Sequence, residues 1–232
     1  MSEALALAEV ALAGENASAV FTPNAEIAQL AAEDPEIKKI LNRADILLPD
    51  GAGVVLASKI LKTPLKEKVA GVDFGENILA LAAKKAHSVY FLGGKPTVAE
   101  AAAANMKQKF PSLSVVGTHD GYFEKHGTEN DAVIEAINAS GAEILFVCLG
   151  APAQEKWIDE NRKSLTYVKL VMGLGGSLDV YAGIVKRAPK IFIKMRLEWF
   201  YRLLKEPRRI GRMMKLPKYV IGTIREKHKN RR

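Results

Sequence analysis

Short apolar runs alternate along the chain with longer stretches in which apolar residues recur at helical spacing. The apolar runs predict strands at residues 19–22, 46–48, 88–92, 113–117, 144–149 and 168–173. The stretches between them predict helices at residues 24–43 with a break at Pro35, 53–60, 74–86, 97–110, 129–140 and 153–163. Runs such as 144–149 are apolar on both faces, which is typical of a parallel sheet covered by helices on each side. This alternation predicts a doubly wound α/β fold with a mostly parallel sheet.

Beyond the dipeptide Ala188-Pro189 the pattern changes. No strand signal remains, and Pro207, Gly211 and Pro217 divide the segment into three or four short predicted helices. Aromatic and aliphatic residues mix there with Lys and Arg, as in amphipathic segments that lie at a membrane interface. We therefore predict a Rossmann-like α/β domain at residues 1–188 and a basic, all-α appendage at residues 189–232 that docks on a membrane.

Charge separates the same two parts of the chain. The net charge of +8 combines a body of −6, residues 1–185, with a tail of +14 that holds 17 Lys and Arg against three acidic residues. Such asymmetry indicates a polyanionic partner, which can be nucleic acid, anionic lipid or a phosphate-bearing substrate. Because no recognised nucleic-acid module is present, we favour an anionic membrane surface and no nucleic acid.

Composition also bears on compartment and chemistry. No apolar run approaches the ~20 residues of a membrane-spanning helix. Residues 1–15 lack a basic start and carry Glu3 and Glu9, so they predict an amphipathic helix rather than a signal peptide. The single cysteine, Cys148, lies within an apolar run and is interpreted as a buried small hydrophobe in a reducing compartment. The histidines show no ligand spacing with one another or with Cys148, so no metal site is predicted.

Glycine-rich or polar loops follow five of the six predicted strands. Ligands of doubly wound sheets bind at the carboxyl ends of the strands, so these loops should meet in one site. The candidate residues that they contain are Thr22, Asn24, Asp50, Gly93, Gly94, Gln154, Gly175, Gly176 and Asp179. Glycines there let backbone N–H groups approach phosphate oxygens, although neither a P-loop nor a dinucleotide GxGxxG motif is present.

Each candidate also has an ordinary structural interpretation. Thr22 can be a helix N-cap, Asn24 a first-turn residue, and Asp50 part of a common Asp-Gly turn. A capping box of Thr97 and Glu100 can account for the turn before the next predicted helix. Turn and helix-start chemistry equally fits the remaining candidates, Gln154, Asp179 and the glycines of 173–176.

Three arginines of the tail are spaced to act together. Arg202, Arg209 and Arg212 lie seven and three residues apart, so they share one helix face if the helix continues past Pro207. The alternative interpretation is a solvated basic face.

A series of short blocks appears in a fixed order between residues 20 and 218. These are TPNAE at 22–26, LPDGAGVV at 48–55, VAGVD at 69–73, FLGG at 91–94, Gly117 with GYF at 121–123, LGAP at 149–152 with QEKW at 154–157, GLGGSLD at 173–179, and RAP at 187–189 with LEW at 197–199 and Arg202. In this order they resemble the WecG/TagA/CpsF glycosyltransferase family. Members of that family usually have an extra strand pair before the first helix, whereas this chain starts near that helix.

The resemblance implies transfer of N-acetylmannosamine (ManNAc) from UDP-ManNAc to undecaprenyl-diphosphate-linked N-acetylglucosamine (GlcNAc), for wall teichoic acid or related surface polysaccharides. Other relatives use UDP-glucose or UDP-ManNAcA, the donor of the uronic acid of N-acetylmannosamine. It further implies that Asp50 is the catalytic base, that Thr22, Asn24 and Gln154 line the pocket, and that Arg202, Arg209 and Arg212 close over the site. Tyr122 enters the substrate-binding set through the same resemblance.

We expect an inverting displacement in which Asp50 removes the proton of the acceptor hydroxyl. Without a metal or cofactor, the tail arginines and the backbone N–H groups near Gly175 and Gly176 would stabilise the leaving diphosphate. The expected location is cytoplasmic and peripheral, on the inner face of the plasma membrane. Two other hypotheses stay open: a non-catalytic nucleotide-binding domain that associates with membranes, and a nucleic-acid-binding protein. A homo-oligomer is also left open.

Overall fold

The computed structural model describes residues 1–189, 192, 200–201, 211 and 215–229. Its six-stranded sheet has the order β2-β1-β6-β5-β3-β4, and all neighbouring strands are parallel. The strands are β1 Ser18–Phe21, β2 Ile46–Leu47, β3 Ser88–Gly93, β4 Ser114–His119, β5 Ile144–Cys148 and β6 Leu170–Gly173. All six predicted strands are therefore confirmed, as is the doubly wound α/β fold.

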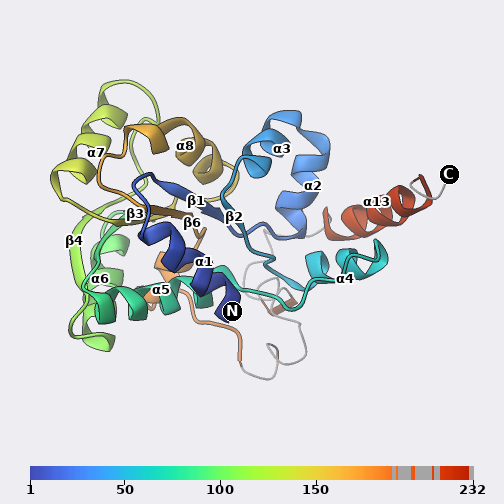
Figure 1. Ribbon diagram of the computed structural model, residues 1–232, viewed down its shortest axis with the longest axis horizontal. Coiled ribbons are helices and arrows are strands. Elements are labelled where there is room, and N and C mark those ends of the chain that lie inside the picture. The colour runs from blue at the N-terminus through green and yellow to red at the C-terminus, as the bar shows by residue number, and fades with distance from the viewer. Residues whose placement is uncertain (190–191, 193–199, 202–210, 212–214, 230–232) are drawn as a thin grey trace.

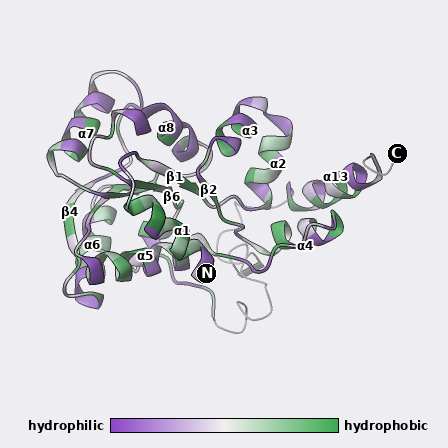
Figure 2. Cartoon of the chain, viewed as in Figure 1, coloured by the Kyte–Doolittle hydropathy of each residue, from purple (hydrophilic) through white to green (hydrophobic). Residues whose placement is uncertain are grey.

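Helices cover both faces of this sheet (Figure 1). The α-helices of the described residues are α1 Ser2–Leu12, α2 Ala25–Glu33, α3 Pro35–Asn42, α4 Ala52–Ile60, α5 Gly71–Lys85, α6 Val98–Lys109, α7 Thr128–Ala139, α8 Ala153–Asn161, α9 Ser177–Tyr181 and α13 Lys215–Lys229. In Figure 1, α1, α5 and α6 lie on one side of the sheet and α3, α7 and α8 on the other. The apolar colouring of Figure 2 is concentrated in the central strands, between these two helical layers.

Strand β5 shows why the sheet is buried on both faces. Its residues Ile144 and Phe146 belong to the core beneath α5 and α6, whereas Leu145 and Val147 belong to the core beneath α7 and α8. Successive side chains of a strand point to opposite faces, so an unbroken apolar run fills both cores. This arrangement leaves the carboxyl ends of the strands as the place where polar side chains can gather.

The predicted break at Pro35 is confirmed. Pro35 is the first residue of α3, and the Asp34 side chain accepts a hydrogen bond from the backbone N–H of Glu36 at 2.8 Å. Proline fits the first helical position because its missing N–H has no partner to lose there. The predicted capping box is wrong: Thr97 precedes α6 in the left-handed region at φ 72°, and its side chain makes no capping bond.

The described part of the C-terminal segment is helical and packs on the body. Helix α13 contacts α2 and α4, and Lys218 forms an ion pair with Glu33 of α2. A Cβ atom added at Gly53 of α4 would lie 2.7 Å from Leu216 Cδ1 and 2.8 Å from Ala25 Cβ. Gly53 is therefore the position at which α4 allows close packing of α13 and α2. Within the described residues, no helix is both long and apolar enough to span a bilayer.

Candidate active site

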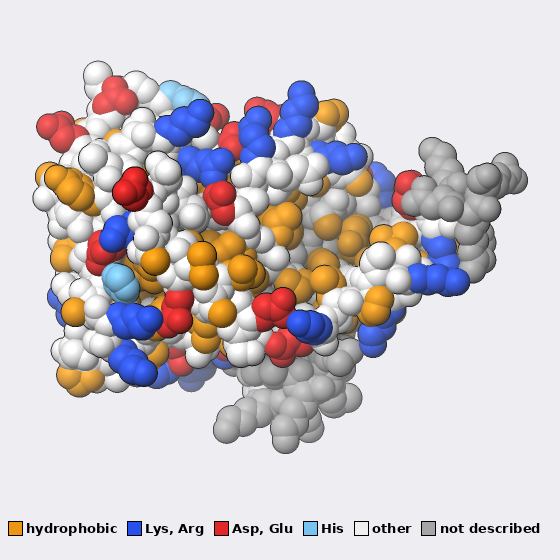
Figure 3. All heavy atoms as spheres, viewed as in Figure 1, with side chains coloured by type: hydrophobic (Ala, Val, Ile, Leu, Met, Phe, Trp, Pro, Cys, Tyr) orange, Lys and Arg blue, Asp and Glu red, His pale blue; other side chains and the backbone are white. Residues whose placement is uncertain are grey.

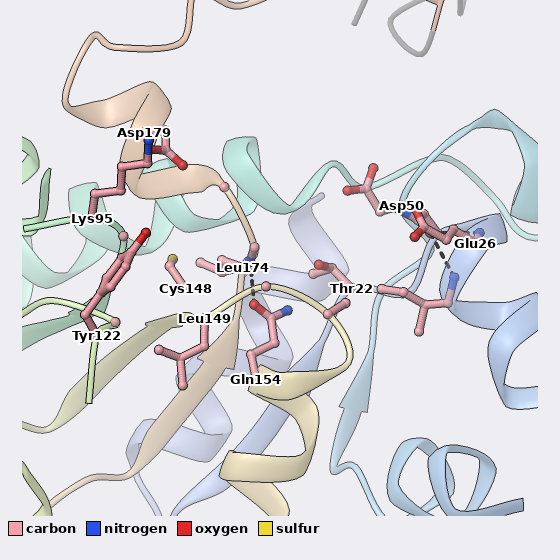
Figure 4. A pocket seen from close by; sticks show the side chains of 18 residues that line it. Thr22, Glu26, Asp50, Lys95, Tyr122, Cys148, Leu149, Gln154, Leu174 and Asp179 are labelled. Atoms are coloured by element: carbon pink, nitrogen blue, oxygen red, sulfur yellow. Dashed lines mark hydrogen bonds between the residues drawn. The ribbon is translucent and has the colours of Figure 1, made fainter. Parts of the chain in front are cut away.

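A cavity of about 570 Å³ opens at the carboxyl ends of the strands and draws its lining from the loops after all six. It brings together most of the candidates predicted from the sequence: Thr22, Asn24, Asp50, Gly94, Tyr122, Gln154, Gly175, Gly176 and Asp179. Figure 4 shows Asp50 and Glu26 at one end, Lys95, Tyr122 and Asp179 at the other, and Gln154 and Thr22 between them. The convergence follows from the sheet, since parallel strands place all their carboxyl ends at one edge.

Three predicted residues lie outside the described part of the chain, namely Arg202, Arg209 and Arg212. Among the described candidates, Gly93 does not line the cavity. Its φ is 127°, and a Cβ there would clash with the backbone carbonyl of Cys148. We therefore interpret Gly93 as a residue that lets β3 and β5 pack closely, and not as a ligand-binding residue.

Asp50 is fixed at what we call the Asp50 end of the cavity, formed by Thr22, Asn24, Glu26 and Asp50. Its backbone N–H donates to Pro23 O at 3.2 Å, and its Oδ2 accepts from the N–H of Gly71 at 3.3 Å. Gly71 is the first residue of α5, so the carboxylate faces a helix N-terminus, where the dipole stabilises negative charge. The following residue, Gly51, has a φ of 90° that glycine adopts at little cost.

Thr22 and Asn24 hold the neighbouring loop. The N-cap of α2 is Asn24, whose Oδ1 accepts from the N–H groups of Glu26 at 2.9 Å and Ile27 at 3.1 Å. The alternative assignment of Thr22 as the cap is therefore wrong. The Thr22 hydroxyl instead donates to Gly173 O at 3.4 Å, which links the ends of β1 and β6.

Gln154 lines the cavity between its two ends, and the buried Glu155 lies behind it. The Gln154 amide donates from Nε2 to Glu155 Oε1 at 2.9 Å, and its Oε1 accepts from the N–H of Gly175 at 2.8 Å. Glu155 is only 1% exposed, and its Oε2 has no hydrogen-bond partner among the described atoms. Burial raises the pKa of the Glu155 carboxyl. The expectation for Gly175 needs correction, because its N–H is directed to Gln154 and not toward the space a diphosphate would occupy.

The opposite wall, the Tyr122 end, consists of Gly94, Lys95, Tyr122 and Asp179. The Tyr122 side chain is 69% exposed, and its backbone N–H donates to Asp120 Oδ1 at 2.7 Å. The loop that carries Tyr122 is held against the turn after β3, because the N–H of Gly121 donates to Gly94 O at 2.8 Å. In Figure 4 the Tyr122 ring lies next to Lys95, on the same side of the cavity as Asp179. The connections from β3 to β4 and from β5 to β6 run in opposite directions along the sheet. The switch point of the sheet therefore lies between β3 and β5, beside the Tyr122 end.

The described lining has an unfavourable charge for a diphosphate. It includes the acidic residues Glu26, Asp50 and Asp179 and the basic residue Lys95. Lys95 and Glu26 were not among the sequence candidates, although Glu26 belongs to the block at 22–26 and Lys95 directly follows the block at 91–94. Within the described residues, no group of three or more His, Cys, Asp or Glu side chains is arranged to hold a metal ion.

Cys148 lines the cavity at the end of β5 and is buried. Burial raises the pKa of its thiol to about 12, so the thiol stays protonated near neutral pH. The interpretation of Cys148 as a buried small residue is confirmed.

Comparison with known proteins adds a family to this geometry. A family model described as "Glycosyl transferase WecG/TagA/CpsF family" matches residues 1–232. A Bacillus spizizenii protein named N-acetylglucosaminyldiphosphoundecaprenol N-acetyl-beta-D-mannosaminyltransferase is 39% identical over 206 residues, which cover 89% of this chain and 78% of that protein. Proteins with the same name from Bacillus subtilis strain 168 and Staphylococcus aureus strain MRSA252 are 36% and 35% identical, over 89% and 90% of this chain and 79% and 81% of theirs.

Proposed function

The chain belongs to the WecG/TagA/CpsF glycosyltransferase family, and we propose that it transfers N-acetylmannosamine from UDP-ManNAc to undecaprenyl-diphosphate-linked GlcNAc. The names of the relatives state this sugar and this acceptor. The product would enter the synthesis of wall teichoic acid or a related surface polysaccharide. The observation that carries the proposal is that one cavity holds a fixed carboxylate, Asp50, at one end and an exposed aromatic ring, Tyr122, at the other.

In the proposed reaction Asp50 is the general base. It takes the proton of the acceptor hydroxyl while that oxygen forms a bond to the anomeric carbon of the donor sugar. The bond from that carbon to the UDP oxygen breaks, and its electron pair leaves with UDP. Attack from the face opposite the leaving group inverts the anomeric configuration. Asp50 then returns its proton to water.

We propose that the nucleotide of the donor binds at the Tyr122 end. The phenol ring offers a flat, exposed surface on which uracil can stack. The carboxylate of Asp179 can accept hydrogen bonds from uracil or ribose, and the turn at Gly94 brings Lys95 beside the expected diphosphate. Support comes from the switch-point rule, which favours this crevice for the ligand. The sugar would then extend past Gln154 toward Thr22 and Asp50.

The negative charge on the departing UDP requires more positive charge than Lys95 supplies. We propose that Arg202, Arg209 and Arg212 contribute it, and that the reaction is independent of metal ions. The basic segment 189–232 would also hold the enzyme on the inner face of the plasma membrane, where its lipid acceptor resides. This segment would then have two roles, completing the site and docking at the membrane.

A donor screen tests the proposal. The full chain is incubated with a short-chain lipid-diphosphate GlcNAc acceptor and with UDP-ManNAc, UDP-ManNAcA, UDP-glucose or UDP-GlcNAc, and UDP release is measured. We expect release with UDP-ManNAc that depends on the acceptor and persists in EDTA. Preference for another donor would contradict the sugar assignment, and UDP binding without turnover for any donor would favour the non-catalytic hypothesis.

A further inference from the structure

The segment from Leu56 to Lys66 is unusually apolar and basic for an exposed part of the body. Leu56, Leu61 and Leu65 are 48%, 38% and 39% exposed. Three exposed lysines are interspersed with them, at positions 59, 62 and 66, and no acidic residue occurs between Gly51 and Lys66. We call these six side chains the α4–α5 surface. It lies outside the basic tail, so the tail does not account for it.

This surface is held in a defined shape. The Ser58 hydroxyl is buried, donates to Val55 O at 2.8 Å and accepts from the N–H of Leu65 at 3.1 Å. The backbone carbonyl of Ser58 accepts a hydrogen bond from the N–H of Thr63 at 3.0 Å. The loop is therefore folded back on α4, and its leucines stay exposed although the backbone is ordered by several bonds. An apolar loop that is both exposed and fixed is typical of an interaction surface.

The loop between α4 and α5 is connected directly to the Asp50 end of the cavity. Helix α4 starts at Ala52, two residues after Asp50. At the other end of the loop, the N–H of Val69 donates to Pro49 O at 2.9 Å and that of Gly71 to Asp50 Oδ2. A molecule bound at the α4–α5 surface would thus lie one loop away from Asp50.

Helix α13 extends the surface. It packs against α4, and it leaves Ile221 and Ile224 exposed by 51% and 42%, next to the exposed Arg225. Figure 3 shows apolar side chains over α4 and α13, with Lys and Arg side chains at their edges. Two helices that are far apart in sequence but pack together therefore both carry exposed apolar and basic side chains.

We infer that the α4–α5 surface docks on an anionic lipid bilayer and presents the Asp50 end of the cavity to it. The mixture of leucine and lysine without acids complements acidic head groups over an apolar interior. The inference rests on the proposed function for its biological sense, since a lipid-linked acceptor would reach Asp50 from that bilayer. With the basic tail as a second attachment, the body would be held in one orientation.

An ion pair within the protein limits the contribution of Lys66 to the charge of this surface. Lys66 forms an exposed ion pair with Glu3 at 2.7 Å, and Glu67 pairs with the terminal amine of Met1. Exposed pairs are weak, so Lys66 can exchange this partner for a lipid phosphate. A basic residue near an anionic surface changes binding by about fivefold. We therefore expect the leucines and the lysines to contribute separately.

Vesicle flotation with the full chain tests the inference. The vesicles contain phosphatidylglycerol and phosphatidylcholine in equal parts, without donor or acceptor. We expect Lys59→Gln/Lys62→Gln/Lys66→Gln to weaken binding by at least about tenfold. Leu61→Ser/Leu65→Ser should weaken it by about tenfold and should also weaken binding to vesicles of phosphatidylcholine alone.

Matched controls change the same residue types elsewhere. Lys38→Gln/Lys39→Gln/Lys107→Gln removes the same charge from exposed positions on α3 and α6, and Val116→Ser/Tyr167→Ser removes two exposed apolar side chains. Both controls should bind vesicles within about twofold of the wild type. Thermal unfolding of each variant checks that its fold is retained.

Equal vesicle binding by surface and control variants would overturn the inference. So would loss of a dimer in sedimentation by Leu61→Ser/Leu65→Ser with vesicle binding unchanged, because the surface would then be an interface between two copies. Turnover separates this inference from the proposed function. The surface variants should lose activity on an acceptor embedded in vesicles and keep it on a short-chain, water-soluble acceptor. A wild type that binds vesicles but lacks turnover would refute only the proposed function.

Discussion

At the Asp50 end of the cavity the short side chains of Thr22, Asn24 and Asp50 hydrogen-bond to backbone groups, whereas at the Tyr122 end glycine turns present an exposed ring and a lysine. The first arrangement gives a carboxylate one position and one orientation, as proton transfer requires. The second gives a flat surface and backbone close approach, as recognition of a nucleotide requires. Between the two ends, the side chain of Gln154 accepts a hydrogen bond from the N–H of Gly175. The difference suggests that chemistry and donor recognition can be separated by mutation.

The largest effect should come from Asp50→Asn, which removes the proposed base and keeps the side-chain size. We expect turnover to fall by about 10³-fold, within the range for loss of general base catalysis, because the acceptor hydroxyl keeps its proton. UDP affinity, measured by calorimetry, should stay within about twofold. Glu26→Gln is the matched control, since it neutralises another carboxylate at the same end. Near-normal turnover of Asp50→Asn, or an equal loss in Glu26→Gln, would remove Asp50 from its role.

At the other end, Tyr122→Ala should act mainly on binding. Loss of a stacking surface costs about 1–3 kcal/mol per base, so UDP affinity should fall by roughly 5-fold to 160-fold. With saturating donor, kcat should change by less than about threefold, the opposite pattern to Asp50→Asn. Tyr122→Phe keeps the ring and should bind UDP nearly normally. A variant with normal UDP affinity and reduced kcat would place Tyr122 in catalysis and break the comparison.

The sequence predicts the sheet and its site well because both depend on local patterns. Six apolar runs are sufficient to locate the strands, and the parallel order then brings Asp50, Gln154 and Asp179 to one edge. What it misses depends on contacts between distant residues or on backbone geometry. Thr97 adopts a left-handed conformation that no capping pattern encodes. Likewise, the bond from Gly175 to Gln154 joins two loops, so the sequence could not show that this N–H is already used.

The assignment of the cap of α2 illustrates the same limit at shorter range. Thr22 and Asn24 are both good capping residues on either side of Pro23, and local preference does not choose between them. The choice follows from β6, because the end of β6 provides Gly173 O for the Thr22 hydroxyl. Gly53 gives a further example, since its small size is explained only by α13, a helix more than 160 residues later.

Gly53 offers a way to test whether the Asp50 end depends on α13. In Gly53→Ala the new Cβ would lie within 2.8 Å of Leu216 Cδ1 and Ala25 Cβ, so α13 or α2 must shift. We expect the free energy of unfolding to fall by about 1–2 kcal/mol despite the better helix propensity of alanine, as in other overpacked sites. Turnover should fall with it, while UDP affinity at the Tyr122 end stays close to normal.

Gly222→Ala is the matched control for this change. Gly222 lies in α13, where an added Cβ would come no closer than 3.9 Å to Gln29 Oε1, so alanine should stabilise the helix by up to about 1 kcal/mol. Urea unfolding of the two variants gives the comparison. The same sign of change in both would show that the packing of α13 against α4 is not what Gly53 protects.

The smallest effect concerns Glu155, which is buried beside Gln154. Its pKa is raised by burial, so the folded state binds more protons than the unfolded state between the unfolded pKa and the raised one. The stability that this group contributes is therefore fully present below the ordinary glutamate pKa of 4.5 and declines as pH rises toward the folded pKa. Glu155→Gln keeps an acceptor for the Gln154 amide and cannot ionise. We expect the free energy of unfolding of this variant to equal that of the wild type or exceed it by about 1 kcal/mol at pH 8, and any advantage to disappear at pH 4. Urea unfolding at both pH values measures this difference. A constant difference between the two pH values would mean that the pKa of Glu155 is the same in the folded and unfolded states, and the expected effect of burial would be refuted.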